Sequence, residues 1–301
     1  MSDPTVEPGA PADGATNLPS ASEKSVAAEA KRRVPKLAQL AATPDRIILR
    51  LNKLLAAPGG LSAFLSTFNY TLYLLAWLEA KSTPLKIRIY QLLNNTTVVT
   101  VVDNGPSHIA ALGSLLSSTR TTLRLFGLLP MYAWFRQLMQ GPKPGQDRIL
   151  YATSVTQCCL YISFQFLENV AFLTDHNVLP RSYTTRWTQA SGGKTAKIYL
   201  WSYRSWMGGV LCDIVRLFRE AQLERARRSQ RTTTDVSTME EDKATDEKWW
   251  SQMVVPLSWL PVAIQFSKEG GIPGFNLGIM GLCGAMAGLG RTAELWAKTA
   301  E

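Results

Sequence analysis

Two arginines on one predicted helix are the residues best suited to bind an anionic group. Arg120 and Arg124 lie about one helical turn apart, so their side chains project from the same side of a helix. Guanidinium groups form charge-assisted hydrogen bonds with phosphates, and anionic membranes present phosphates at their surface. The chemistry that this pair indicates is reversible binding of lipid headgroups.

Motifs for catalysis and for metal binding are absent from the sequence. The two histidines, His108 and His176, have no second histidine or cysteine at the spacing of metal ligands. Residues 191–195 (SGGKT) end like a phosphate-binding loop, but Thr188 stands where that motif requires glycine. We therefore predict no catalytic residues, no metal site and no cofactor, and the sequence does not support an enzyme.

Composition and charge favour a protein that contacts a membrane. Of the 301 residues, 46% are apolar and 18% are charged, below the roughly 25% of ordinary soluble domains. The net charge of +9 fits either anionic lipids or nucleic acid. Most Trp and Tyr residues lie in uncharged runs and not between basic residues, so we predict no binding of nucleic acid. The spacing of the four cysteines is unlike that of a disulfide-rich secreted domain and indicates a reducing compartment.

Residues 112–126 are predicted to form the amphipathic helix that carries the two arginines. At 100° per residue, the large apolar side chains share one face and small hydroxyl residues occupy the opposite face. Such a helix lies in the bilayer interface with its arginines on headgroups. The alternative is a helix whose leucines fill the core of a soluble bundle, and periodicity does not separate the two. The predicted membrane-binding residues are Leu112, Leu115, Leu116, Arg120, Leu123, Arg124 and Phe126.

Three other segments are candidates for entry into a bilayer. Residues 54–78 are uncharged, and a buried core helix is the alternative there. Residues 149–167 are also uncharged and just long enough to cross, but Gln157 and Gln165 make them a weak span. Residues 270–290 are the strongest predicted transmembrane helix, because large apolar residues occupy the faces that glycine does not, which disfavours a flexible loop. Small residues recur every three or four positions and predict close helix packing and oligomerisation: Gly274, Gly278, Gly281, Ala285 and Gly288.

Composition divides the chain into four parts. Residues 1–35 form a predicted disordered tail, and residues 36–228 form a predicted helical, membrane-associated domain. Residues 229–248, rich in Thr, Ser, Asp and Glu, are predicted to be a flexible polar linker. Residues 249–301 form a predicted hairpin that contains the Gly-rich transmembrane helix. The predicted fold class is therefore an all-α integral membrane protein with amphipathic interfacial helices.

Three segments resemble the peroxin-eleven family of peroxisomal membrane proteins. Residues 117–126 (SSTRTTLRLF) are similar to that family's S/T-R-x-x-x-R-L-F signature, and residues 166–173 (FLENVAFL) are similar to its central E-x-V/I-A-W/F segment. Residues 259–261 (WLP) and 278–282 (GIMGL) resemble its C-terminal half-span and Gly-rich terminal span. The resemblance covers residues 36–298, is closest to the gamma-type branch and indicates a fungal protein.

The resemblance implies a non-enzymatic protein of the peroxisomal membrane, multi-pass or deeply embedded, with both termini in the cytosol. Such a protein promotes membrane elongation, curvature and peroxisome division through insertion of the amphipathic helix and homo-oligomerisation. Anionic membrane lipids, further copies of the chain and the peroxisome division machinery are the expected partners. The resemblance also allows a pore or metabolite channel, and a soluble all-α enzyme or binding module is the third alternative.

Overall fold

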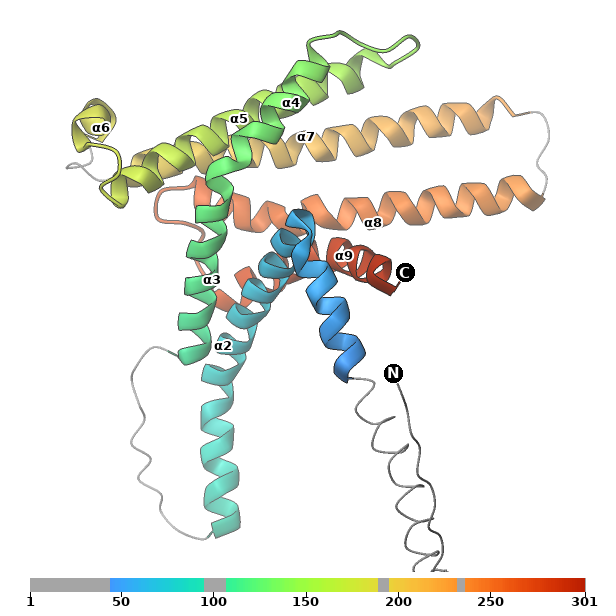
Figure 1. Cartoon of the computed structure of the whole chain (residues 1–301). Helices are drawn as coiled ribbons and strands as arrows, with labels where there is room; N and C mark the ends of the chain where they lie inside the picture. The colour runs from blue at the N-terminus through green and yellow to red at the C-terminus, as the bar shows by residue number, and fades with distance from the viewer. Residues whose placement is uncertain (1–43, 95–106, 189–194, 232–235, 301) are drawn as a thin grey trace, which may run out of the picture. The chain divides into compact units, whose positions relative to one another are not determined.

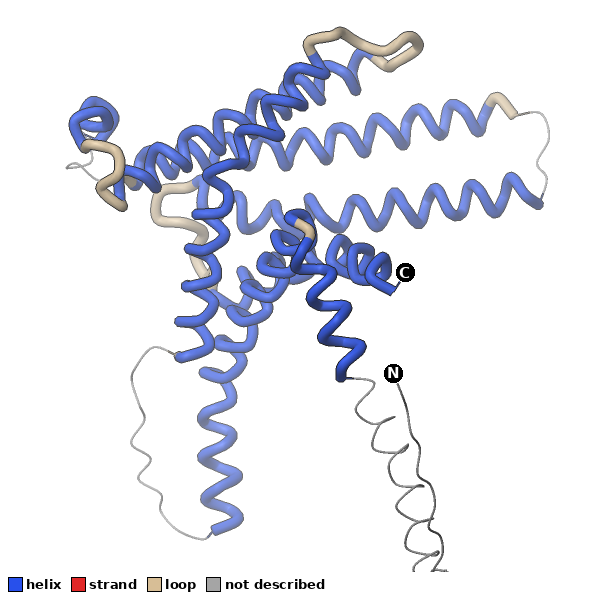
Figure 2. Tube along the Cα trace, viewed as in Figure 1, coloured by secondary structure: helices blue, strands red, loops and turns tan. Residues whose placement is uncertain are grey.

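The computed structural model of the chain describes residues 44–94, 107–188, 195–231 and 236–300. These residues form helices joined by turns and loops, with no strand among them (Figure 2). The prediction of an all-α fold is therefore confirmed for the described part of the chain. The predicted tail, residues 1–35, lies outside it.

The chain divides into two compact units, Met1–Lys53 and Leu54–Glu301. In the first unit, residues 44–53 are helical. Ile47, Ile48 and Leu49 of this helix are exposed.

The second unit contains the candidate site. Its elements (Figure 1) are α2 (Pro58–Asn94), α3 (His108–Arg124), the short 3-10 helix η1 (Leu125–Gly127), α4 (Leu128–Leu138), α5 (Arg148–Asp175), α6 (Arg181–Thr188), α7 (Ala196–Ser229), α8 (Val236–Ser267), α9 (Leu277–Ala297) and η3 (Lys298–Ala300). Helix α2 packs against α9 and α3, α5 packs against α7 and α4, and α8 packs against α7 and α9. Residues from opposite ends of the sequence, in α2 and α9, therefore form one of the main contacts.

Glycines on α9 allow its close approach to α2. A Cβ atom built on Gly281 would meet the α2 backbone, and one on Gly284 would meet the ring of Tyr70. A Cβ atom on Gly278 would meet the ring of Trp77 in the same way. The stripe of small residues predicted from the sequence thus packs against a helix of the same chain, where α2 occupies the space that side chains would need.

The Gly-rich helix begins later than the sequence predicts. Gly274 has a φ angle of 80°, in the left-handed region that favours glycine, and lies in the loop before α9. Helix α9 starts at Leu277, where the side chain of Asn276 caps its first turn. Gly274 therefore does not share the helical face of the other small residues. The last turns of α9 carry Arg291 and Glu294.

One segment among the described residues is long and apolar enough to cross a bilayer by length and composition. It is Pro58–Ser82 in α2, with 25 residues and a mean hydropathy of 1.2. It overlaps the predicted segment 54–78. Residues 149–167 lie in α5, and residues 277–290 of the predicted segment lie in α9; neither helix contains a stretch that meets the same criterion. A transmembrane Gly-rich helix and a multi-pass topology stay predictions.

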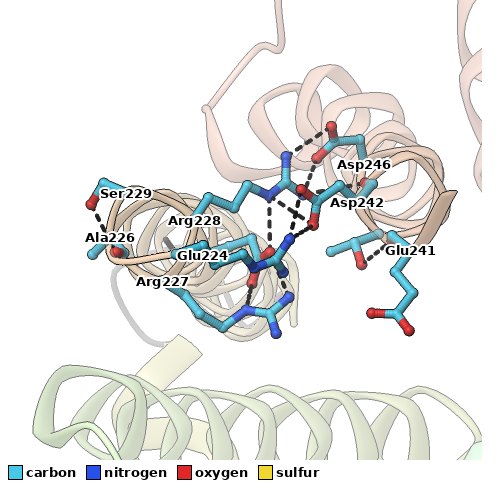
Figure 3. A network of polar contacts seen from close by, with 10 residues as sticks. Glu224, Ala226, Arg227, Arg228, Ser229, Glu241, Asp242 and Asp246 are labelled. Atoms are coloured by element: carbon cyan, nitrogen blue, oxygen red, sulfur yellow. Dashed lines mark hydrogen bonds and ion pairs between the residues drawn. The ribbon is translucent and has the colours of Figure 1, made fainter. Parts of the chain in front are cut away.

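Most of residues 229–248 are helical and do not form the flexible linker that the composition indicated. Helices α7 and α8 run side by side, and Figure 3 shows the ion pairs that join their ends. Arg228 of α7 contacts Asp246 and Asp242 of α8 at 2.8 and 3.5 Å, and it also contacts Glu224 on its own helix at 2.9 Å. Asp242 and Asp246 of α8 thus share Arg228 of α7 as a partner.

Candidate functional site

The apolar face of α3 and η1 is exposed. Leu112, Leu115, Leu123 and Phe126 expose 43%, 63%, 48% and 73% of their surfaces, and Leu116 is half-buried. These side chains therefore do not fill the core of the second unit. This exposure favours the interfacial interpretation of the segment over a core helix of a soluble bundle.

The arginine side of α3 faces the protein. Arg124 donates two hydrogen bonds to Glu168 of α5, from Nε to Oε2 at 2.9 Å and from Nη2 to Oε1 at 2.8 Å. The guanidinium carbon of Arg120 lies 5.4 Å from the centre of the Tyr70 ring on α2, which is cation–π geometry. Helix α3 thus presents its charged side to the protein and its leucines to the surroundings.

The placement of both arginines differs from the sequence expectation, in which they contact lipid phosphates. Arg124 forms an ion pair with Glu168, whose side chain is only 2% exposed. Burial lowers the pKa of Arg120, and this residue has no salt-bridge partner among the described residues. Sequence analysis did not identify Glu168 as a functional partner. The sequence did contain an indication that Arg124 and Glu168 matter together, because they lie in two of the segments that resemble the peroxin-eleven family.

Side chains of α5 also hold the break between α3 and α4. Asn169 donates a hydrogen bond to the carbonyl oxygen of Leu125 at 3.0 Å, and Gln165 donates one to the Asn169 side chain at 2.7 Å. A carbonyl at a helix end lacks an intrahelical partner, so the Asn169 amide satisfies a group that the break leaves free. Helix α5 therefore fixes both the rotation of α3 and the point where it ends.

A cavity of about 350 Å³ lies beside the arginines. Its polar side is formed by Ser117, Arg120, Thr121, Arg124 and Glu168. Most of the remaining lining is aromatic, and we call five of these residues the aromatic wall: Phe164, Tyr203, Trp206, Trp259 and Phe266. Tyr70 and Tyr73 of α2 and Met280 of α9 complete the lining. Burial raises the pKa of Tyr203 to about 12, so its hydroxyl is neutral at physiological pH and can donate a hydrogen bond.

Other helices of the second unit also bury polar groups and expose apolar ones. Buried polar side chains include Asn69, Gln157, Gln165, Glu168 and Ser202. Exposed apolar side chains include Leu129 and Tyr132 on α4, Trp201 and Phe218 on α7, and Leu282 and Leu289 on α9. Large exposed apolar surfaces mark contacts with a membrane or another protein, and buried polar groups facing a helical interior are typical of membrane proteins.

A family model described as peroxisomal biogenesis factor 11 (PEX11) matches residues 102–296, which is more than half of the chain. The chain belongs to this family. No curated protein and no solved structure matches it. The region that matches the PEX11 model contains the Arg124–Glu168 pair, the cavity residues of α3 to α9 and the glycines of α9. PEX11 membership makes this protein a peroxisomal biogenesis factor, while the gamma-type branch and the fungal origin stay predictions.

Proposed function

We propose that this PEX11 protein elongates the peroxisomal membrane and promotes peroxisome division without catalysing a reaction. The apolar face of α3 and η1 inserts into the cytosolic leaflet of the membrane and expands it relative to the lumenal leaflet. An amphipathic helix that inserts at this depth favours positive curvature. The single observation that carries the proposal is the orientation of α3, whose leucines are exposed while its arginines bind the protein.

Attachment of α3 to α5 gives the arginines a different role from the one predicted. The Arg124–Glu168 ion pair holds α3 in one rotation, so that the leucine face stays outward while the helix is embedded. The exposed threonines of the inserted face do not oppose insertion strongly. Thr119 and Thr122 donate their hydroxyl protons to the carbonyl oxygens of Leu115 and Ser118, at 3.0 and 3.1 Å, and so satisfy these groups within the helix.

Contacts with anionic lipid come from basic residues beyond α3. Arg136 near the end of α4, Lys143 in the following loop and Arg148 at the start of α5 are exposed. They follow the exposed apolar residues of η1 and α4 along the chain, as expected for an interfacial segment whose basic groups reach headgroups. A membrane rich in anionic lipid is therefore the proposed partner.

Homo-oligomerisation and recruitment of the division machinery remain part of the proposal. The glycine face of α9 is covered by α2 of the same chain, so a dimer through that face would require α2 to move. The opposite face of α9 exposes Ile279, Leu282, Met286 and Leu289 and is the surface we assign to self-association.

The test is tubulation of anionic liposomes by the reconstituted full-length protein. The variant Leu115→Glu/Leu123→Glu places two charges on the inserted face and should abolish tubules seen by electron microscopy. The control Ser237→Glu/Ser251→Glu adds the same charge at exposed positions of α8 and should tubulate like the unmodified protein. Unchanged tubulation by the α3 variant would refute the mechanism. Conductance in planar bilayers without tubulation would instead indicate the pore alternative.

A further inference from the structure

The cavity beside α3 has two chemically different sides. Helix α3 contributes hydroxyl and guanidinium groups, whereas α5, α7 and α8 contribute the aromatic wall. The rings of the wall contact one another: Trp206 and Trp259 have centroids 5.6 Å apart, and Tyr203 and Phe266 have centroids 5.1 Å apart. The wall is thus an apolar surface in a cavity that two guanidinium groups also line.

The charges at the cavity do not balance. Glu168 neutralises Arg124 through two hydrogen bonds, which leaves the charge of Arg120 uncompensated by any salt bridge among the described residues. Arg120 instead lies over the Tyr70 ring, and burial lowers its pKa. In the described part of the chain, Glu168 is the one carboxylate that lines the cavity, and it acts on both Arg120 and Arg124, so one positive charge stays unbalanced and an anion bound beside Arg120 would relieve this cost.

The volume limits what can occupy the cavity. At about 30 Å³ for a group the size of a water molecule, 350 Å³ accommodates about a dozen non-hydrogen groups. This lies at the lower end of the roughly 300–1,000 Å³ typical of small-molecule sites. The cavity is therefore suited to one single-chain molecule and is too small to enclose a whole two-chain lipid.

We propose that this cavity binds one anionic amphiphile, with its carboxylate or phosphate head beside Arg120 and its apolar part against the aromatic wall. The aromatic wall by itself would also suit an alkylammonium group. The two arginines exclude that ligand class, because the side chains of Arg120, Arg124 and Glu168 together carry one net positive charge at the cavity. The site does not depend on membrane insertion by α3, so it goes beyond the proposed function.

Calorimetric titration of the full-length protein in zwitterionic lipid nanodiscs tests the site. Octyl phosphate and nonanoate share an eight-carbon chain that fits the cavity and differ in the acidic head, so comparing them separates a phosphate ligand from a carboxylate ligand. Octyltrimethylammonium has the same chain with a cationic head, and inorganic phosphate has the head alone. Empty nanodiscs give the background from the bilayer. We expect saturable binding of one anion per protein for at least one acidic probe and none for the cationic probe or for inorganic phosphate.

Two variants localise the binding. Arg120→Gln should weaken it about tenfold or more through loss of a charged hydrogen-bond partner, and Arg120→Lys should recover part of the loss. Ser117→Leu keeps Arg120 but fills part of the cavity, so it should also reduce binding. Arg225→Gln removes an exposed arginine of α7 outside the cavity and should bind like the unmodified chain.

Thermal unfolding followed by circular dichroism establishes that each variant is folded. If Arg120→Gln does not fold, Ser117→Leu decides the outcome. Four outcomes would each overturn the proposal. In the first two, the cationic probe or inorganic phosphate binds as well as the acidic probes do. In the other two, neither acidic probe shows saturable binding, or the folded variants bind undiminished. Loss of tubulation with intact anion binding would refute only the curvature mechanism.

Discussion

Removing Arg124 should destabilise the protein more than removing its partner, Glu168. The Glu168 side chain is 2% exposed and the Arg124 side chain is 35% exposed. In Arg124→Gln, a buried carboxylate loses both of its charged hydrogen bonds. In Glu168→Gln, the guanidinium keeps its solvent-exposed part and its hydrogen bond to the Thr121 hydroxyl at 3.2 Å. The two substitutions therefore break the same pair with unequal consequences.

The magnitude follows from the burial of the pair. Breaking a fully buried ion pair costs about 3–5 kcal/mol. Because Arg124 is partly exposed, solvent screening reduces this to about 2–3 kcal/mol for Arg124→Gln and to about 1 kcal/mol for Glu168→Gln. For a protein of this size, 2–3 kcal/mol corresponds to a fall in Tm of roughly 4–12 °C. The double variant should be more stable than Arg124→Gln alone, since it leaves no unpaired buried charge.

Thermal unfolding of the four proteins in the same detergent, followed by circular dichroism, completes a double-mutant cycle. A coupling energy well above zero supports the pair. If the effects of the two substitutions are additive, or if Arg124→Gln unfolds at the same temperature as the unmodified chain, the pair does not stabilise α3. Reduced binding to anionic vesicles with unchanged Tm would instead support the sequence expectation that Arg124 contacts phosphates.

Three other predictions concern different parts of the second unit. Leu115→Ser/Leu123→Ser removes about 2–3 kcal/mol of transfer free energy from the exposed face of α3. Membrane tubulation should therefore fall, while the Tm of the protein stays within a few degrees. A large fall in Tm would contradict the exposure of these residues. Gly281→Ala should destabilise the contact between α2 and α9. Gly290 has open space around it, so Gly290→Ala should stabilise α9 by about 0.5–1 kcal/mol. Equal Tm shifts for the two variants would refute the close packing of Gly281 against α2. Hydrogen bonds from Arg227 and Arg228 hold the pKa of Glu224 at about 2, below its usual 4.5, so the stability it contributes is present above pH 4.5 and is lost as the pH falls toward 2. The amide protection factors near the end of α7, taken relative to the intrinsic exchange rate at each pH, should fall over that range, and constant protection factors would count against the network.

The sequence predicted the amphipathic helix at residues 112–126 but not its surroundings. Periodicity identifies which residues share a face, and it placed the leucines together correctly. It does not report whether that face meets lipid, a partner or the core, because each of these would give the same pattern. Glu168 lies 44 residues from Arg124 in the chain, and only the contact of α3 with α5 brings the two together.

Two other expectations differ from the structure, one for a long-range reason and one for a local reason. The predicted linker at residues 229–248 rests on the composition of that segment alone, which does not include Arg228 of α7, the partner of Asp242 and Asp246. The predicted start of the Gly-rich helix ignored Asn276, whose side chain caps α9 and leaves Gly274 in a left-handed loop conformation. Close packing by glycine was predictable, but the identity of the neighbour, α2, was not.

The most direct test of the central claim is the environment of residue 115 in the membrane. A nitroxide label at Leu115→Cys, in a chain without the native cysteines, reports collisions with oxygen, which concentrates in lipid, and with a water-soluble nickel complex. A label at Ser237→Cys on α8 serves as the exposed reference. Insertion of α3 predicts frequent collisions with oxygen and few with nickel at residue 115, and the opposite at residue 237. Equal access of nickel to both labels in membrane-bound protein would contradict insertion.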